Sequence, residues 1–330
     1  MHRYSLHERA GPWPVQASAG AEAVMTNGAS GAARVSVCLG FDFDAISLWI
    51  GSMGSTSPSM MSRGEFGAAA IPRILDLLKR YNVRATFCVP GHSVYAYPDL
   101  VRRIHDSGHE LGHHGWVHEN PQKFDRDGER RNLERGFEAF DKVVGIRPRG
   151  YRSPAWDFSE NTVDLLLEFR FDYDSSCMGN DVHPYYLRQG DKASPTEPYV
   201  FGQPVELVEV PVTWGLDDFP PFEFVWGSNS GLASPSDIEE IWRGDFDYAY
   251  RHANPDGDGA VYALTMHPQV IGRGHRMLML ERLLQHMSGH DGVAFEMISE
   301  FVDRWKAANP LDQWKTDHPE YAESGLRGAS

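Results

Sequence analysis

The strongest constraint on the fold is an alternation of short apolar segments with longer amphipathic segments, which begins at Arg34 and continues to residue 308. Short apolar runs are typical of buried strands, whereas apolar residues spaced three or four apart are typical of helices with one buried face. Strands and helices that alternate this often predict an α/β fold with a largely parallel sheet. No glycine-rich phosphate loop follows the first strand and no break in composition divides the region, so the sequence favours one closed or nearly closed barrel.

The positions of the individual elements follow from the same periodicities. We expect strands at 34–43, 83–89, 109–112, 149–152, 205–210 and 260–266. We expect helices at 66–81, 98–107, 132–144, 236–252, 277–287 and 297–308. A capping box of Ser236 and Glu239 is predicted at the start of the fourth helix. The longest irregular stretch, 215–235, is rich in proline, glycine and aromatic residues, and a loop of that length in a compact domain is usually functional.

Three parts are predicted along the chain of 330 residues. Residues 1–33 show no periodicity and are rich in alanine, serine and glycine, which predicts an extended or flexible N-terminal arm. Residues 34–308 are predicted to form a single barrel domain, and residues 309–330 a C-terminal tail. An arm of this kind can pack on a neighbouring subunit, which hints at a homo-oligomer.

Charge and composition argue against several kinds of partner. Lysine plus arginine number 31 and aspartate plus glutamate 46, which gives a net charge of −15. A chain this acidic repels nucleic-acid phosphates and anionic lipid, and no apolar run approaches the roughly 18 residues of a membrane span. We therefore expect neither nucleic acid nor membrane as a partner. Three widely spaced cysteines and a polar, proline-interrupted N-terminus lead us to expect reduced thiols and a cytoplasmic location.

Two aspartates stand at the end of the first predicted strand, in the sequence Gly40-Phe41-Asp42-Phe43-Asp44. Because side chains alternate across a strand, Asp42 and Asp44 are expected to point to the same side, roughly 7 Å apart. Two carboxylates on one side are costly unless a cation or a proton lies between them. Taken alone, the pattern also fits a strand end that emerges into solvent.

Histidines are dense between residues 105 and 118, where three pairs are spaced four apart: 105/109, 109/113 and 114/118. This spacing brings two side chains together on a helical turn, an arrangement that suits a divalent metal. The first pair straddles Gly108, where a helix should stop, and the second spans a predicted strand. Only His114 and His118 lie in a segment after the strand where the chain can coil.

Two further residues stand where predicted strands end. His267 follows an apolar strand and precedes Pro268, so that it could act as a general acid or could simply cap a turn. Arg152 ends the predicted strand 149–152 and could make a two-pronged bond to a carboxylate, although arginines usually cover surfaces.

Taken together and in this order, these segments resemble the NodB-type polysaccharide deacetylases, which form carbohydrate esterase family 4. The similarity is strongest towards the branch that contains the Helicobacter-type peptidoglycan deacetylase, cyclic imide hydrolases and the metal-independent allantoinase, and it covers residues 35–305. The segments that carry it are FDFDAISLWI (41–50), SPSMMSRGEFG (57–67), PGHS (90–93), GHELGHHGWVHENP (108–121), GYRSP (150–154), NDVHPYY (180–186), EVPVTWGLDDFPP (209–221) and LTMHP (264–268).

The resemblance implies a distorted (β/α)7-type barrel, the NodB homology fold, with one divalent metal held by an aspartate and two histidines. Carried onto this chain, the metal ligands would be Asp44, His114 and His118. Two nitrogens and one oxygen suit zinc, although cobalt, nickel or manganese could fill the same site.

The resemblance also implies the roles of the neighbouring residues. Asp42 would be the general base, His267 the general acid, and Arg152 the residue that orients Asp42. Aromatic side chains crowd the same segments, which suits a sugar or a flat heterocycle but also ordinary packing at a barrel mouth. The candidate substrate contacts are Trp49, Glu65, His92, Trp214 and Asp217.

The chain departs from the common deacetylase pattern in three places. Phe43 separates the two aspartates, the third motif lacks an aromatic residue directly after Pro154, and the fourth motif is reduced to Trp214 with Asp217 and Asp218. These departures argue against a polysaccharide substrate more than they argue against hydrolysis of an amide bond.

The function implied is that of a metal-dependent hydrolase of non-peptide C–N bonds, which removes N-acetyl groups from an amino sugar or a glycan fragment. One alternative is an amidohydrolase that opens a small cyclic amide, such as an imide or allantoin. A second alternative is a barrel that binds a saccharide without catalysis. A glycosidase that uses the paired aspartates is a weaker interpretation, because that mechanism does not need the histidine pair.

Overall fold

The computed structural model of the protein describes residues 33–253 and 259–321. The described residues form one compact unit. The predicted N-terminal arm, 1–33, lies outside the described residues except for its last residue. Within the described ranges, no helix combines the length and the apolar character that a membrane crossing requires.

The described residues form a nine-stranded sheet whose strands follow the spatial order β6-β7-β5-β4-β3-β2-β1-β8. Seven of these strands, from β7 to β8 in this order, are joined by parallel pairings, and β6 runs antiparallel to β7. The ninth strand, β9, pairs with the beginning of β1. The bounds are β1 (Val35–Asp42), β2 (Thr86–Val89), β3 (Glu110–His113), β4 (Gly150–Tyr151), β5 (Tyr173–Asp174), β6 (Tyr185–Gln189), β7 (Gln203–Glu209), β8 (Ala260–Met266) and β9 (Val293–Phe295).

The sheet curls towards closure, although no strand pairing joins β6 to β8 in the part of the chain that the structure describes. The amide of Val261 in β8 donates a hydrogen bond of 2.9 Å to the carbonyl oxygen of Val182, just before β6, so the two ends of the sheet approach each other. The result is a distorted, incompletely closed barrel built on parallel strands. This confirms the predicted α/β fold of (β/α)7 type.

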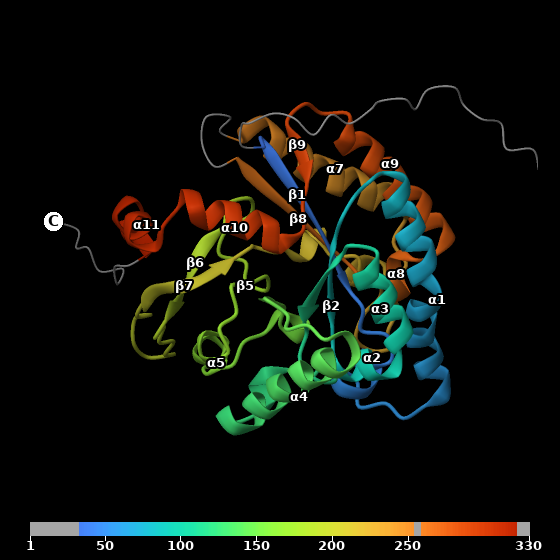
Figure 1. Cartoon of the computed structure of the whole chain (residues 1–330), viewed down its shortest axis with the longest axis horizontal. Coiled ribbons are helices and arrows are strands. Elements are labelled where there is room, and N and C mark those ends of the chain that lie inside the picture. The colour runs from blue at the N-terminus through green and yellow to red at the C-terminus, as the bar shows by residue number, and fades with distance from the viewer. Residues whose placement is uncertain (1–32, 254–258, 322–330) are drawn as a thin grey trace, which may run out of the picture. The chain divides into compact units, whose positions relative to one another are not determined.

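Helices surround this sheet in the order that alternation with the strands predicts (Figure 1). Helix α11 lies inside the segment predicted as the C-terminal tail. The helices are α1 (Pro58–Arg80), α2 (Gly91–Ala96), α3 (Pro98–Asp106), α4 (Arg126–Val144), α5 (Thr162–Glu168), α6 (Phe219–Phe222), α7 (Pro235–His252), α8 (Pro268–Ile271), α9 (Gly274–Ser288), α10 (Ile298–Ala308) and α11 (Leu311–Asp317).

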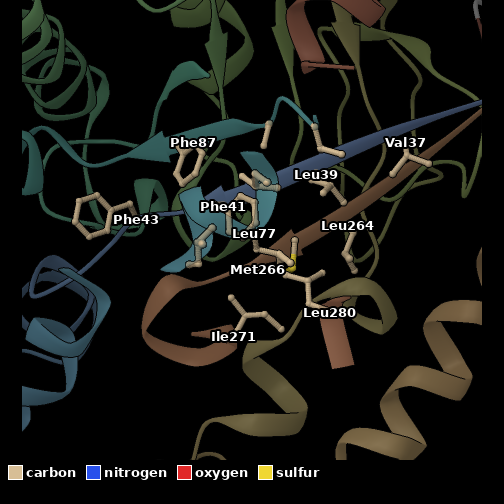
Figure 2. Packing of buried hydrophobic residues seen from close by; sticks show 14 of the residues in the cluster. Val37, Leu39, Phe41, Phe43, Leu77, Phe87, Leu264, Met266, Ile271 and Leu280 are labelled. Carbon is tan, nitrogen blue, oxygen red and sulfur yellow. The ribbon is translucent and has the colours of Figure 1, made fainter. Parts of the chain in front are cut away.

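The main apolar core lies where β1 and β8 run side by side under the outer helices (Figure 2). Every residue of β1 is buried, which is why the strand reads as a nearly continuous apolar run in the sequence. Leu39 and Phe41 of β1 pack with Leu264 and Met266 of β8, and Leu280 of α9 closes the same cluster. Each such side chain contributes about 1.5–3 kcal/mol when it is fully buried. This core fixes the strand ends that carry the polar residues described below.

Several predicted helix starts differ from the structure. Helices α4 and α9 begin at Arg126 and Gly274, ahead of the predicted residues 132 and 277. Helix α1 begins at Pro58, ahead of the predicted residue 66, because a proline at the first position is compatible with a helix start. The predicted capping box of Ser236 and Glu239 is wrong. Ser234 precedes α7 and Pro235 is its first residue, while the Glu239 carboxylate bonds to Arg282. The three cysteines are unpaired, as predicted, and two of them are buried.

Candidate active site

Side chains from four strand ends converge at the carboxyl-terminal end of the barrel, where parallel α/β barrels carry their functional groups. Asp42 is the last residue of β1, and Asp44 lies two residues beyond it. His114, Arg152 and His267 follow β3, β4 and β8 directly. The sheet topology therefore brings together all six residues predicted as metal ligands or catalytic groups, His118 included.

The two aspartates point to the same side of the strand, as their spacing predicts. Oδ2 of Asp42 lies 3.8 Å and Oδ1 of Asp44 lies 3.4 Å from the same atom, Nε2 of His114. Phe43 between them belongs to the apolar core. Both carboxylates are buried, so neither emerges into solvent.

Asp44, His114 and His118 form a compact buried group in which one ligand atom from each residue lies within 4.8 Å of the others. Oδ2 of Asp44 is 3.7 Å from Nε2 of His118. The two imidazole rings lie edge to face, with centroids 4.9 Å apart. This geometry can hold one metal ion between two nitrogens and one oxygen.

A tight turn, not a helix, holds the two histidines together. Gly115 and His118 have positive φ angles of 69° and 60°, and the Glu119 carboxylate accepts hydrogen bonds from the backbone amides of Trp116 and Val117. Only glycine adopts such a φ readily, so Gly115 is the residue that lets the chain turn directly after β3. The predicted coiling of this segment is therefore a turn closed by a carboxylate.

Hydrogen bonds fix which ring nitrogen of each histidine faces the group. The Nδ1–H of His114 donates to the Arg152 carbonyl oxygen at 2.6 Å. The Ser52 hydroxyl donates to the His118 carbonyl oxygen, so it accepts from Nδ1–H of His118 at 2.6 Å. Nε2 of both rings therefore faces Asp44. Metal-binding histidines typically have such a partner on the other nitrogen.

The charge balance of the group also fits a cation. Oδ1 of Asp44 and Nε2 of His114 are buried and have no hydrogen-bond partner among the described residues. Burial would raise the pKa of Asp44, but the histidines around it, His118 first, outweigh burial and lower the pKa to about 2. Burial lowers the pKa of His118 to about 4, against the opposing effect of Asp44. An ionised carboxylate beside a neutral imidazole is the protonation state that a metal requires of its ligands.

Asp42 is held from the other side by Arg152. Nη1 of the guanidinium donates to Oδ1 of Asp42 at 2.8 Å, while Nε and Nη2 bond to the carbonyl oxygen and hydroxyl of Ser175, each at 2.9 Å. Gly40 leaves room for this ion pair, because a Cβ there would lie 2.7 Å from Nη1. Asp42 is thus paired with a cation and fixed in orientation.

His267 is held by Asp218 in the same manner. Its Nδ1–H donates to Oδ1 of Asp218 at 2.7 Å, and its backbone amide donates to the same carboxylate at 3.0 Å. Nε2 consequently points at Asp42 and Asp44, at 4.0 Å and 3.7 Å. Burial would lower the pKa of His267, but Asp217 and Asp218 outweigh burial and raise the pKa well above its usual value. The two carboxylates thus favour the protonated form of the ring, the form that can donate a proton.

These groups open onto a cavity of about 180 Å³. Trp156 and Trp214 stack at 4.4 Å between ring centroids and form one wall of it. Ala155 and Trp156 both have positive φ, which costs about 1–3 kcal/mol per residue and is typical of functional sites. The lining residues are Asp42, Leu48, Ser52, Met53, His114, His118, Ala155, Trp156, Trp214, Asp217, Phe219 and His267.

The predicted substrate contacts divide into two groups. Trp214 and Asp217 line the cavity, whereas Trp49, Glu65 and His92 are absent from its lining. Trp49 is fully buried beneath the Arg63 guanidinium. His92 lies edge-on to Trp116 and bonds to Ser47, and Glu65 is exposed on α1.

Several residues that touch the central groups, Ser52 among them, are missing from the predicted set. Three more are Asp218, Ser175 and Gln269. Asp218 holds His267, Ser175 holds Arg152, and Nε2 of Gln269 lies 3.4 Å from Oδ2 of Asp44. The adjacent aspartates Asp217 and Asp218 in the sequence were a signal from which the role of Asp218 could have been predicted. The other two lie in a serine-rich turn and after a proline, and neither position carries a sequence signal of its own.

Comparison with known proteins gives matches along most of the chain. A family model described as polysaccharide deacetylase matches residues 61–173. The peptidoglycan deacetylase of Helicobacter pylori is 40% identical over 293 residues, which cover 84% of this chain and 99% of that protein. A peptidoglycan deacetylase-like protein of Gibberella zeae is 31% identical over 273 residues, 76% of this chain and 80% of the relative.

Solved structures agree with this result. A candidate polysaccharide deacetylase from Mycobacterium smegmatis superimposes with a TM-score of 0.74 at 33% identity, covering 85% of this chain and 93% of the other. The PuuE allantoinase superimposes with a TM-score of 0.69 at 22% identity, covering 84% and 92%, which shows a shared fold.

Proposed function

We propose how this chain, which belongs to the polysaccharide deacetylase family, carries out its reaction. The deacetylases of this family are divalent-metal-dependent hydrolases of carbon–nitrogen bonds other than peptide bonds. The chain is accordingly a hydrolase of N-acetyl amide bonds. Neither a barrel that only binds a saccharide nor a glycosidase describes it.

Asp44, His114 and His118 are the proposed metal ligands. Two imidazole nitrogens and one carboxylate oxygen favour zinc, and cobalt, nickel and manganese accept the same donors. When bound there, such an ion lowers the pKa of water and polarises an amide carbonyl. The two buried, unpartnered atoms of Asp44 and His114, 3.4 Å apart, support this assignment.

Asp42 and His267 are the proposed general base and general acid. Asp42 takes a proton from the attacking water, and Arg152 holds the carboxylate in its orientation. The water oxygen bonds to the acetyl carbon, the C–N bond breaks, and Nε2–H of His267 protonates the departing nitrogen. Acetate and a free amine are the products. The observation that carries this assignment is that Asp42 and His267 face one cavity, 4.0 Å apart, with oppositely charged partners behind them.

The proposed substrate is an N-acetylated amino sugar in a peptidoglycan fragment. The two relatives that cover most of this chain bear the names peptidoglycan deacetylase and peptidoglycan deacetylase-like protein. Aromatic faces such as those of Trp156 and Trp214 pack well against the apolar face of a sugar ring. A cavity of about 180 Å³ is below the roughly 300–1,000 Å³ of typical ligand pockets, which favours a small ligand or a single sugar unit over several.

The small cavity with its wall of stacked indole rings also favours a second candidate reaction, the opening of a small cyclic imide. A flat ring fits a narrow cavity with one wall of stacked indoles, and ring opening needs the same base, acid and metal. Both candidates use one site, so the chemistry of the product separates them.

The experiment compares two reactions on one preparation. We expect the zinc-loaded protein to release acetate from N-acetylglucosamine oligomers or muropeptides, and Asp42→Asn to reduce that release by roughly 10²–10⁴-fold. Ring opening of succinimide without acetate release would replace the first candidate by the second. Full activity of Asp42→Asn in either assay would overturn the assignment of the base.

A further inference from the structure

A second group of one aspartate and two histidines lies between α7 and α9, which run side by side (Figure 1). Asp247 belongs to α7, His286 to the last turn of α9, and His290 follows α9. Arg34, just before β1, bonds to Tyr250 of α7 and to Gly292 beside His290. This group therefore lies near the amino end of β1, whereas Asp42 is at the carboxyl end of the same strand.

The geometry of this group resembles that of the active-site group. One ligand atom from each residue lies within 4.8 Å of the others. The His286 and His290 rings lie edge to face with centroids 4.8 Å apart, against 4.9 Å for His114 and His118. Both histidine pairs are spaced four residues apart. The third ligand in both groups is an aspartate from another element.

Hydrogen bonding leaves Nε2 of His290 available. Its Nδ1–H donates to the carbonyl oxygen of His286 at 2.9 Å, so the lone pair is on Nε2. The backbone continues the helical turn beyond α9, with the amide of His290 bonded to the Met287 carbonyl at 3.2 Å. A metal-binding histidine typically donates its other ring N–H to a carbonyl or carboxylate in this manner.

Aromatic packing holds both rings in place. Phe246 contacts His286 and His290 edge to face, with centroids 5.7 Å and 5.2 Å away, and Tyr250 lies 4.7 Å from His290. The three ligand residues are only partly buried. One side of the group is thus rigid and apolar, and the other is open to water that can complete a coordination shell.

We propose that Asp247, His286 and His290 form a second binding site, for a divalent transition metal of the zinc class, which joins α7 to α9. Two imidazoles with a carboxylate select zinc, nickel, cobalt or copper(II) over calcium or magnesium. His286 Nε2 bonds to Oδ1 of Asp247 at 2.7 Å without a metal, so the ion replaces the proton of an existing hydrogen bond. The site is independent of the catalytic reaction and lies on the outer helices.

The test is carried out in the His114→Ala background, so that the active-site metal does not contribute. Tag-free protein is stripped with chelator, dialysed against zinc, and analysed for bound zinc by mass spectrometry. We expect about one zinc per chain in His114→Ala. His114→Ala/His290→Gln should bind at least 10–100-fold more weakly, since even changes outside the coordinating shell cost that much.

The matched control is His275→Ala, which removes a histidine near the start of α9 and should keep the zinc. Gln at position 290 can still donate to the His286 carbonyl, and thermal unfolding of the zinc-free variants checks that the fold is intact. Absence of zinc from His114→Ala, or equal zinc in the His290→Gln double variant, would mean that Asp247 and His286 form an ion pair only.

Discussion

The active-site group and the group between α7 and α9 contain the same three side-chain types in nearly the same ring geometry, yet their surroundings differ. The first is buried at the strand ends, where Asp42 with Arg152 and His267 with Asp218 lie beside it. The second lies half-buried on two outer helices. A trio of ligands can hold a metal in either place, but hydrolysis also needs a base and an acid within reach.

The two groups also differ in the free-energy cost of their polar atoms when no metal is bound. Oδ1 of Asp44 and Nε2 of His114 are buried without a hydrogen bond among the described residues, whereas Asp247 and His286 are closed into a bond of 2.7 Å. A buried unpaired polar group costs about 1–3 kcal/mol. Metal binding removes that cost in the first group but must displace a formed hydrogen bond in the second. The active site should therefore bind zinc more tightly.

The largest expected effect is loss of the active-site ligand. His114→Ala should lower turnover by roughly 10³–10⁵-fold, since a catalytic metal supplies several kcal/mol and each 1.36 kcal/mol is tenfold. Acetate release with parallel metal analysis measures both losses. His290→Ala is the matched control and should keep full turnover. If turnover falls equally in both variants, the distinction between the two groups is wrong.

Replacement of the base should separate chemistry from metal binding. Asp42→Asn should lower kcat by roughly 10²–10⁴-fold while the zinc content stays unchanged, because Asp44 still supplies the carboxylate. Steady-state kinetics on a preparation of known metal content measure this. Loss of zinc from the variant would instead make Asp42 a metal ligand.

A smaller effect is expected for the residue behind the acid. Asp218→Asn leaves His267 in place but weakens the bond that orients it, so kcat should fall by roughly 10–100-fold. Asp247→Asn, the corresponding change beside His286, should leave kcat unchanged. An Asp218→Asn enzyme as fast as the wild type would exclude His267 as an oriented acid.

The sequence predicted most of the active site because its spacing carries geometric information. Side chains two apart on a strand share a face, which placed Asp42 and Asp44 together, and elimination of pairs around Gly108 left His114 and His118. The parallel sheet then placed His267 and Arg152 at the same end of the barrel. Each of these steps needs only the residue spacing within one strand or turn and the direction in which the strand runs.

What the sequence missed depends on contacts between distant segments. Asp247 and His286 are brought together by the packing of α7 on α9, and no spacing within one element reveals that. His286 and His290 are spaced four residues apart, but this spacing alone does not distinguish two metal ligands from two histidines that are simply exposed on a helix surface. The aromatic Trp49 was predicted at the cavity, yet packing around Arg63 buries it behind the site.

Short elements were missed for a similar reason. Strands β5 and β9 contain only two and three residues, too few to show a periodicity, and they exist because their neighbours in the sheet hold them. Strand β6 runs antiparallel, which the alternation of strands and helices does not predict. The start of α7 was misplaced because Ser234 with Pro235 competes with Ser236 as a helix beginning.

The smallest expected effect is on stability. A metal that joins α7 to α9 binds the folded chain only, so zinc at about 100 times its Kd should stabilise His114→Ala by about 2.7 kcal/mol and raise its Tm by a few degrees. The same zinc should not shift the Tm of His114→Ala/His290→Gln. Magnesium serves as the control ion, since it disfavours imidazole ligands. An equal shift in both variants would mean that the stabilising zinc binds elsewhere, because His290 is the ligand that one of them lacks.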